Sequence, residues 1–236
     1  MQCLTFQRID VRASHLQDIL PRFPQPWDIL SKRSQLNISS TLMTASEAAK
    51  APTAMIEDPE IAEICIYIQQ VNRLIDSGFA RNGEAFWGRV LFAQFNLLPV
   101  MHSLLSMARH DGSDSIKNKR KEYLRIAAIL YVRQLWAKFG MDNTGISLYT
   151  DKVAAGIISL DLVSTWDTDE AFRYWVLLVG ATCSSVPFDM RLKFGILLTS
   201  HMTSIELPSH LTSSLWCDSA LGSLKSTLEQ IRSSIG

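Results

Sequence analysis

The stretch FRYWVLLVGATCSS, residues 172–185, is the most apolar short segment of this chain and decides its fold class. Its uncharged run extends only from Tyr174 to Phe188, which is shorter than the roughly 20 apolar residues that cross a bilayer. Wound as a helix, the stretch is apolar on two opposite faces: Phe172, Trp175, Val176, Val179 and Cys183 on one, and Leu177, Leu178 and Ala181 on the other. A helix that is apolar all round lies inside a protein core. The stretch therefore predicts a buried central helix rather than a membrane anchor.

Two local features of this central helix can be interpreted. Asp167 and Glu170 have the spacing of a capping box, which predicts where the helix starts. Gly180 lies alone within the apolar run, and the chain contains neither GxGxxG nor GxxxxGK[ST], the glycine patterns of phosphate-binding turns. We therefore interpret Gly180 as a position where a neighbouring group approaches the helix closely.

A second helix is predicted by EDPEIAEICIYIQQVNRLIDSG, residues 57–78. Asp58 suits the N-cap and Pro59 suits the first helical position. Apolar residues then recur at spacings of three and four, which is typical of an amphipathic helix. We expect this helix to end at Gly78.

Residues 84–109 are apolar nearly all round and predict a helix that Pro99 kinks or splits in two. Within them, residues 90–108 are the longest segment without Lys, Arg, Asp or Glu, and this segment reaches the length of a membrane span. It carries polar side chains such as Gln94 and Asn96. This polar load favours a buried helix over a membrane span.

The rest of the chain also follows helical spacing. Further helices are predicted over 116–140 with Gly140 as the terminator, over 148–163, around 192–203, and as a terminal pair within 211–236. No segment shows the clean alternation of a strand. We expect an all-α fold, a single multi-helix domain of roughly seven to nine helices over 57–236. Residues 1–56 are expected to form an N-terminal segment and tether, partly disordered, because they combine a Pro-rich and a Ser, Thr and Ala-rich tract.

Composition narrows the class of protein. Lys plus Arg and Asp plus Glu both total 23, so the net charge is zero, and the general attraction that drives nonspecific nucleic-acid binding is missing. The four cysteines form no CxxC pair, which favours reduced core thiols of an intracellular protein over a disulfide frame or a zinc site. The N-terminus lacks the apolar run of a secretory signal.

One group of residues could carry enzymatic chemistry. His102, His110, Asp111 and Asp114 are residue types that bind a metal ion in all-α phosphohydrolases. We favour the alternative that His110 and Asp111 lie in a solvated turn, because they precede the glycine of HDGSD. An isoprenoid enzyme would need paired carboxylates of the DDxxD type for magnesium, which the chain lacks. We expect no catalytic residue and no cofactor, with an all-α enzyme of either kind as the alternative.

The basic run KNKRK contains Lys117, Lys119, Arg120 and Lys121. It can be interpreted as a nuclear-import signal, as a phosphate-contacting patch, or as the solvated face of a helix. Cations in a first helical turn are unfavourable to the helix dipole, which suggests that these residues are kept for another reason. We therefore consider them candidates for nuclear import.

Three segments in order carry a resemblance to a known family. They are HSLLSM (102–107), EYLRIAAILYV (122–132), and AFRYWVLLVGATCSS (171–185), the last followed by LTSSLWCDSALGSL (211–224). Together they resemble the C-terminal regulatory region of fungal zinc-cluster transcription factors, the fungal-specific transcription factor domain. The resemblance covers about residues 57–232, and the residues that carry it are Arg125, Tyr131, Trp175, Gly180 and Trp216.

The resemblance implies a non-enzymatic, transcription-regulator-like domain that acts in the nucleus, with the cytoplasm as the alternative, through protein or small-ligand contacts. Family members usually begin with a six-cysteine zinc cluster that binds DNA, and this chain has none. We therefore expect no direct DNA binding and no membrane contact. Protein partners or a homodimer are expected, with the terminal helix 221–231 as the dimerisation candidate because Leu224, Leu228 and Ile231 share one face. We also expect Arg125 to form a buried or partly buried ion pair.

Overall fold

A computed structural model describes residues 58–107, 115–141, 170–184, 186–201 and 215–235, together with Val11, Ala13, Ser14, Gln17 and Pro21. All regular structure in these ranges is helical, as the sequence predicted: seven α-helices and one 3₁₀ helix. Within the same ranges, no helix combines the length and hydropathy needed to cross a membrane. The predicted helix over 148–163, the capping residue Asp167 and nearly all of the tether over 1–56 lie outside the described residues.

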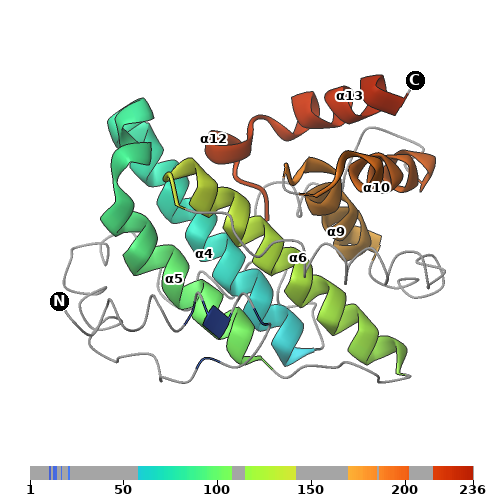
Figure 1. Cartoon of the computed structure of the whole chain (residues 1–236), viewed down its shortest axis with the longest axis horizontal. Coiled ribbons are helices and arrows are strands. Elements are labelled where there is room, and N and C mark those ends of the chain that lie inside the picture. Colours follow the sequence, from blue (N-terminus) through green and yellow to red (C-terminus); the bar gives the residue numbers. More distant parts are fainter. Residues whose placement is uncertain are drawn as a thin grey trace.

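Three long helices form the first part of the fold (Figure 1). They lie side by side, and each contacts the other two. Their bounds are α4 Pro59–Asn82, α5 Val90–Ser106 and α6 Ile116–Lys138, with the 3₁₀ helix η3 Gly83–Gly88 between α4 and α5. The middle of α6 is buried on every side, from Leu124 to Val132, because α4, α5 and α9 all pack against it.

The second part is a layer of shorter helices against α6 (Figure 1). Its central member, α9 Glu170–Thr182, packs on α6 and on α10 Phe188–His201. The short α12 Asp218–Leu221 lies on α4, and α13 Leu224–Ile235 lies on α10. Every residue from Arg173 to Ala181 is buried, so the prediction of a central helix is confirmed.

Glycines define two important points of this architecture. Gly140 has a φ of 67° and follows the end of α6, as predicted. Gly180 faces Phe194 of α10, and a Cβ at this position would come within 2.8 Å of the ring. The interpretation of Gly180 as a point of close approach is therefore confirmed, and it explains how α9 and α10 pack together.

The start of α4 agrees with the sequence, but its end does not. Asp58 caps the helix by accepting a hydrogen bond from the Glu60 N–H at 3.1 Å, and Pro59 occupies the first position. The helix continues past Gly78 to Asn82 and ends at Gly83, where φ is 55°. Gly78 lies instead against the Phe86 ring, which a side chain would overlap. The expected terminator is thus a contact glycine.

The boundaries of two other predicted helices also need correction. The segment 84–109 holds part of η3 followed by α5, which runs unbroken through the buried Pro99, so the proline does not split the helix. At the C-terminus, Leu221 belongs to α12, and Gly222, with a φ of 86°, separates it from α13. Positive φ at Gly222 ends the short helix because other residues adopt this conformation only with strain.

Candidate ligand-binding site

The basic run opens α6 and makes structural contacts with the start of α4. Lys121 Nζ lies 3.1 Å from the Asp58 carboxylate and 2.6 Å from that of Glu60, and Lys117 Nζ lies 3.2 Å from Asp58. Burial opposes ionisation of Asp58, but Lys121, Lys117 and the Glu60 N–H outweigh it and hold the pKa of Asp58 below its ordinary value. Two of the four candidate import residues thus fix α6 to α4.

Arg125 forms the buried ion pair that the sequence predicted. Its Nε and Nη2 donate to the two carboxylate oxygens of Glu122 at 2.9 and 2.7 Å, and Nη1 donates to the Leu104 carbonyl at 3.4 Å. Only 2% of the Arg125 side chain and 8% of the Glu122 side chain are exposed. The pair lies within α6, Arg125 reaches α5 at the Leu104 carbonyl, and a pair this deeply buried is closed to a ligand.

Three of the residues that carry the resemblance meet in the core. The ring centroid of Tyr131 lies 5.6 Å from that of Trp175 and 6.2 Å from that of Trp216. Trp175 Nε1 donates to the Leu215 carbonyl at 2.9 Å, and Trp216 Nε1 donates to the Gly222 carbonyl at 3.0 Å. These aromatic residues join α6, α9 and the segment before α12.

The Tyr131 hydroxyl group and the nearby Cys217 thiol are the chemically reactive groups at this aromatic cluster. Tyr131 donates to Asn72 Oδ1 at 2.9 Å, and Cys217 donates to Asp76 Oδ1 at 3.4 Å. Burial, with the charge of Asp76, raises the pKa of the Cys217 thiol, and burial also raises the pKa of Tyr131. Burial likewise raises the pKa of Cys65 to about 12. Because the thiolate is the reactive form, neither cysteine is activated as a nucleophile.

The metal hypothesis can be examined at one residue. His102 is buried in α5, and its Nδ1 lies 3.4 Å from Ser106 Oγ. His110, Asp111 and Asp114 lie outside the described residues. Within the described ranges, no three His, Cys, Asp or Glu side chains come together as metal ligands.

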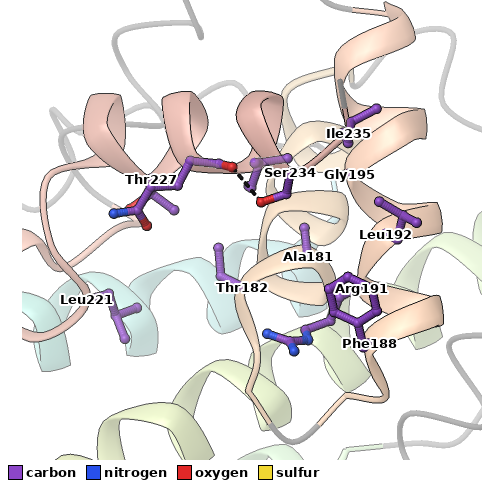
Figure 2. A pocket seen from close by; sticks show the side chains of 12 residues that line it. Ala181, Thr182, Phe188, Arg191, Leu192, Gly195, Leu221, Thr227, Ser234 and Ile235 are labelled. Carbon is purple, nitrogen blue, oxygen red and sulfur yellow. Dashed lines mark hydrogen bonds between the residues drawn. The ribbon is translucent and has the colours of Figure 1, made fainter.

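A cavity of roughly 270 Å³ opens between the C-terminal end of α9, one face of α10 and helices α12 and α13. Figure 2 shows its walls, with Thr182 at the end of α9, Phe188 and Leu192 on α10, and Ile235 on α13. Gly195 lies where α13 comes close to α10. A Cβ atom at this position would lie 3.0 Å from the Ile231 side chain and 3.2 Å from the Ile235 side chain, so the glycine allows this approach. The cavity therefore has aliphatic side chains where α10 and α13 approach each other, beside the polar side chains of Thr227, Gln230 and Ser234 on α13.

Arg191 is the one charged residue among the twelve that line this cavity. Its side chain extends from α10 towards the side of Thr182 and Leu221 (Figure 2) and lies 5.7 Å from the Phe188 ring centre. Its Nε is buried and has no hydrogen-bond partner, and no carboxylate of the described residues pairs with it. A buried donor without a partner is unfavourable unless a ligand supplies an acceptor.

The surface of α10 next to the cavity is unusually apolar. Phe188 is 65% exposed and Ile196 is 44% exposed, two turns apart on the same helix. Phe188 also lines the cavity, and exposed apolar residues at the mouth of a cavity are typical of binding surfaces.

The face proposed for dimerisation is used within the chain. Leu228 of α13 is buried, and Leu224 and Ile231 pack against the core beside α10. This face is therefore partly used within the chain, where α13 packs on α10, and its binding to a second copy stays a prediction.

Sequence reasoning missed Arg191 and the cavity. A signal was present: α10 is apolar at Phe194 and Leu198, which face inward, and again at Phe188, Leu192 and Ile196. Two helices, α9 and α13, pack on α10, yet Phe188 and Ile196 remain exposed. Exposed apolar residues and an arginine on the same helix indicate a surface that binds another molecule.

No family model, curated protein or solved structure gives a significant match to this chain.

Proposed function

We propose that this chain is a non-enzymatic, transcription-regulator-like helical domain that acts in the nucleus through contacts with a small ligand or a protein partner. The observation that carries the proposal is the surface of α10, where Phe188 and Ile196 are exposed and Phe188 also lines a cavity. By contrast, Arg125, Tyr131 and Cys217 are engaged inside the core. The part of the molecule that offers a surface to another molecule is therefore α10.

The resemblance to the regulatory domain of fungal zinc-cluster transcription factors supports the same function. Of the residues that carry it, Tyr131, Trp175 and Trp216 pack around one point, and Gly180 sets the contact between α9 and α10. In this proposal they form the scaffold that holds α10 in place, and they do not touch the ligand or partner.

The charges support a function without direct DNA binding. Phosphate contacts require cations that are available to the backbone of DNA. Lys121 lies between two carboxylates, and Lys117 pairs with one of them. Because the chain as a whole is neutral, we propose that any link to DNA goes through a partner.

A reporter assay tests the regulatory function. The full chain, fused to a bacterial DNA-binding domain in a fungal reporter strain, should change reporter expression relative to the DNA-binding domain alone. The double variant Phe188→Ser, Ile196→Ser should abolish this change at equal protein abundance. Val90→Ser with Leu91→Ser is the matched control, since these residues are 41% and 66% exposed at the start of α5. A silent fusion, or equal loss in both double variants, would overturn the proposal.

Nuclear localisation is tested with a fluorescently tagged chain. Lys119→Gln with Arg120→Gln should lower the ratio of nuclear to cytoplasmic fluorescence, because these changes remove import charges and spare the contacts of Lys117 and Lys121 with α4. Lys225→Gln with Arg232→Gln, on α13, removes the same charge and should leave the ratio unchanged. Cytoplasmic wild-type protein would contradict the nuclear assignment.

A further inference from the structure

We propose that the cavity between α9, α10, α12 and α13 binds a small molecule with an apolar body and one carboxylate group, which Arg191 holds. The inference rests on the proposed function, because it names the class of ligand that the regulatory domain would sense. It is carried by the cavity itself and by the position of the single cation within it.

The size of the cavity points to a small ligand. Its volume of roughly 270 Å³ lies just below the approximately 300–1,000 Å³ of typical small-molecule pockets. A compact acid fits this space.

The charge of the cavity points to an anion. Arg191 is its one charged lining residue, and the Arg191 Nε–H is buried without an acceptor. A guanidinium presents its N–H donors in a planar fork that matches the two oxygens of a carboxylate. A carboxylate in the cavity would meet the terminal Nη edge of this fork, because the Nε atom itself has almost no accessible surface.

The hydroxyl groups around the cavity are hydrogen-bonded within their own helices. Thr182 donates to the Leu178 carbonyl at 2.8 Å, Thr227 to the Ser223 carbonyl at 3.1 Å, and Ser234 to the Gln230 carbonyl at 2.8 Å. Because each hydroxyl hydrogen is used within its own helix, these oxygens present lone pairs to a ligand. The lone pairs on these hydroxyl oxygens repel a second carboxylate of the ligand and accept a hydrogen bond from a ligand donor.

The remaining walls suit an apolar body. The apolar lining residues are Phe188 and Leu192 on α10, Ile231 and Ile235 on α13, and Leu221 on α12. Contact with these side chains would remove apolar surface of the ligand from water, which supplies most of the affinity of small apolar molecules.

The test is calorimetric titration of the full chain with butanoate, hexanoate and phenylacetate, each compared with its neutral amide. The best of the three acids should bind at least about tenfold more tightly than its amide, the magnitude that a hydrogen bond to a charged group typically contributes. Arg191→Gln should remove this preference. Lys193→Gln, which removes an exposed charge from the same helix, should keep it.

A second measurement does not depend on the folding of any variant. The same acid added to wild-type protein should shift the NMR signals of the Ile231 and Ile235 methyl groups and leave those of Ile61 and Ile64, buried in α4, unchanged. Equal affinity for acid and amide, no binding by any acid, or equal loss in Lys193→Gln would overturn the ligand proposal. If the reporter response nevertheless depends on Phe188 and Ile196, the regulatory function stands and only the ligand class is wrong.

Discussion

Arg125 in the α4–α5–α6 bundle and Arg191 in the α9–α10–α13 layer both lie among apolar helices, but their surroundings differ. Arg125 makes two hydrogen bonds to Glu122 and one to the Leu104 carbonyl. Arg191 lines a cavity, and its buried Nε has no partner. Phe188, which is largely exposed on α10, lines the same cavity. Arg125 is therefore engaged inside the bundle, whereas Arg191 and Phe188 of the layer border a cavity that is available to another molecule.

The largest effect is expected from breaking the ion pair in the bundle. Glu122→Ala leaves Arg125 buried without its carboxylate, which should lower the free energy of unfolding by about 3–5 kcal/mol in urea denaturation. Replacing both residues, Glu122→Leu with Arg125→Met, should recover most of this loss, because no unpaired charge remains. Glu63→Ala, at an exposed position of α4, is the control and should change stability by no more than about 0.5 kcal/mol. A small effect of Glu122→Ala would contradict the view that Arg125 depends on its ion pair whereas Arg191 does not.

The glycine contacts should give the next largest effect, and they exist in both regions. Gly180→Ala would place a methyl group 2.8 Å from the Phe194 ring, and Gly78→Ala would overlap the ring of Phe86, which packs against Trp87 and Phe139. Each should lower the melting temperature and cost about 1–3 kcal/mol, as overpacking typically does. Gly88→Ala has no neighbour within 4 Å and should be nearly neutral. A neutral Gly180→Ala would mean that α9 and α10 are loosely packed.

The contact between α4 and α6 should contribute less and depend on pH. Asp58→Asn keeps a capping oxygen and removes the charge that pairs with Lys117 and Lys121, so we expect a loss of about 1 kcal/mol at pH 7. Because the folded pKa of Asp58 lies below the ordinary value of 3.8, this stabilisation is complete above about pH 4 and is lost as the pH falls through the folded pKa. Urea denaturation of both proteins between pH 7 and pH 3 measures the difference. A difference that grows towards low pH would contradict this assignment.

The smallest effect is expected on the surface of α10. Phe188→Ser with Ile196→Ser should change the free energy of unfolding by no more than about 0.5 kcal/mol per residue, because both side chains are largely exposed. Thermal denaturation by circular dichroism measures this. A large loss of stability would show that Phe188 and Ile196 pack within the protein, so they would not form a surface for another molecule.

Local sequence signals predicted helix interiors and several helix ends correctly. The Asp58–Pro59 start of α4, the Gly140 stop of α6 and the burial of residues 173–181 follow from capping preference, positive φ and all-round apolarity, which act within a few residues. Gly78 was misread, because a glycine that ends a helix and a glycine that admits a neighbouring ring look the same in sequence. The neighbour, Phe86, is brought there by a 3₁₀ turn.

The candidate site could not be predicted in the same way. Its residues come from α9, α10, α12 and α13, and none of these helices contains a motif for ligand binding. The basic run presents the converse case, since Lys121 looked like a solvated import residue until α4 brought Asp58 and Glu60 beside it. In both cases the decisive neighbour lies on another helix.

By itself, the sequence predicted that this protein is all-α, that the helix over 173–181 lies in its core, and that Arg125 forms a buried or partly buried ion pair. These properties depend on spacing along one helix and on the cost of burying a charge. Only the tertiary structure decided that α13 packs on α10, that Lys121 binds the start of α4, and that Arg191 opens onto a cavity. The physical reason is that the partner of a face or a charge depends on which helices pack together, and packing joins residues far apart in the chain.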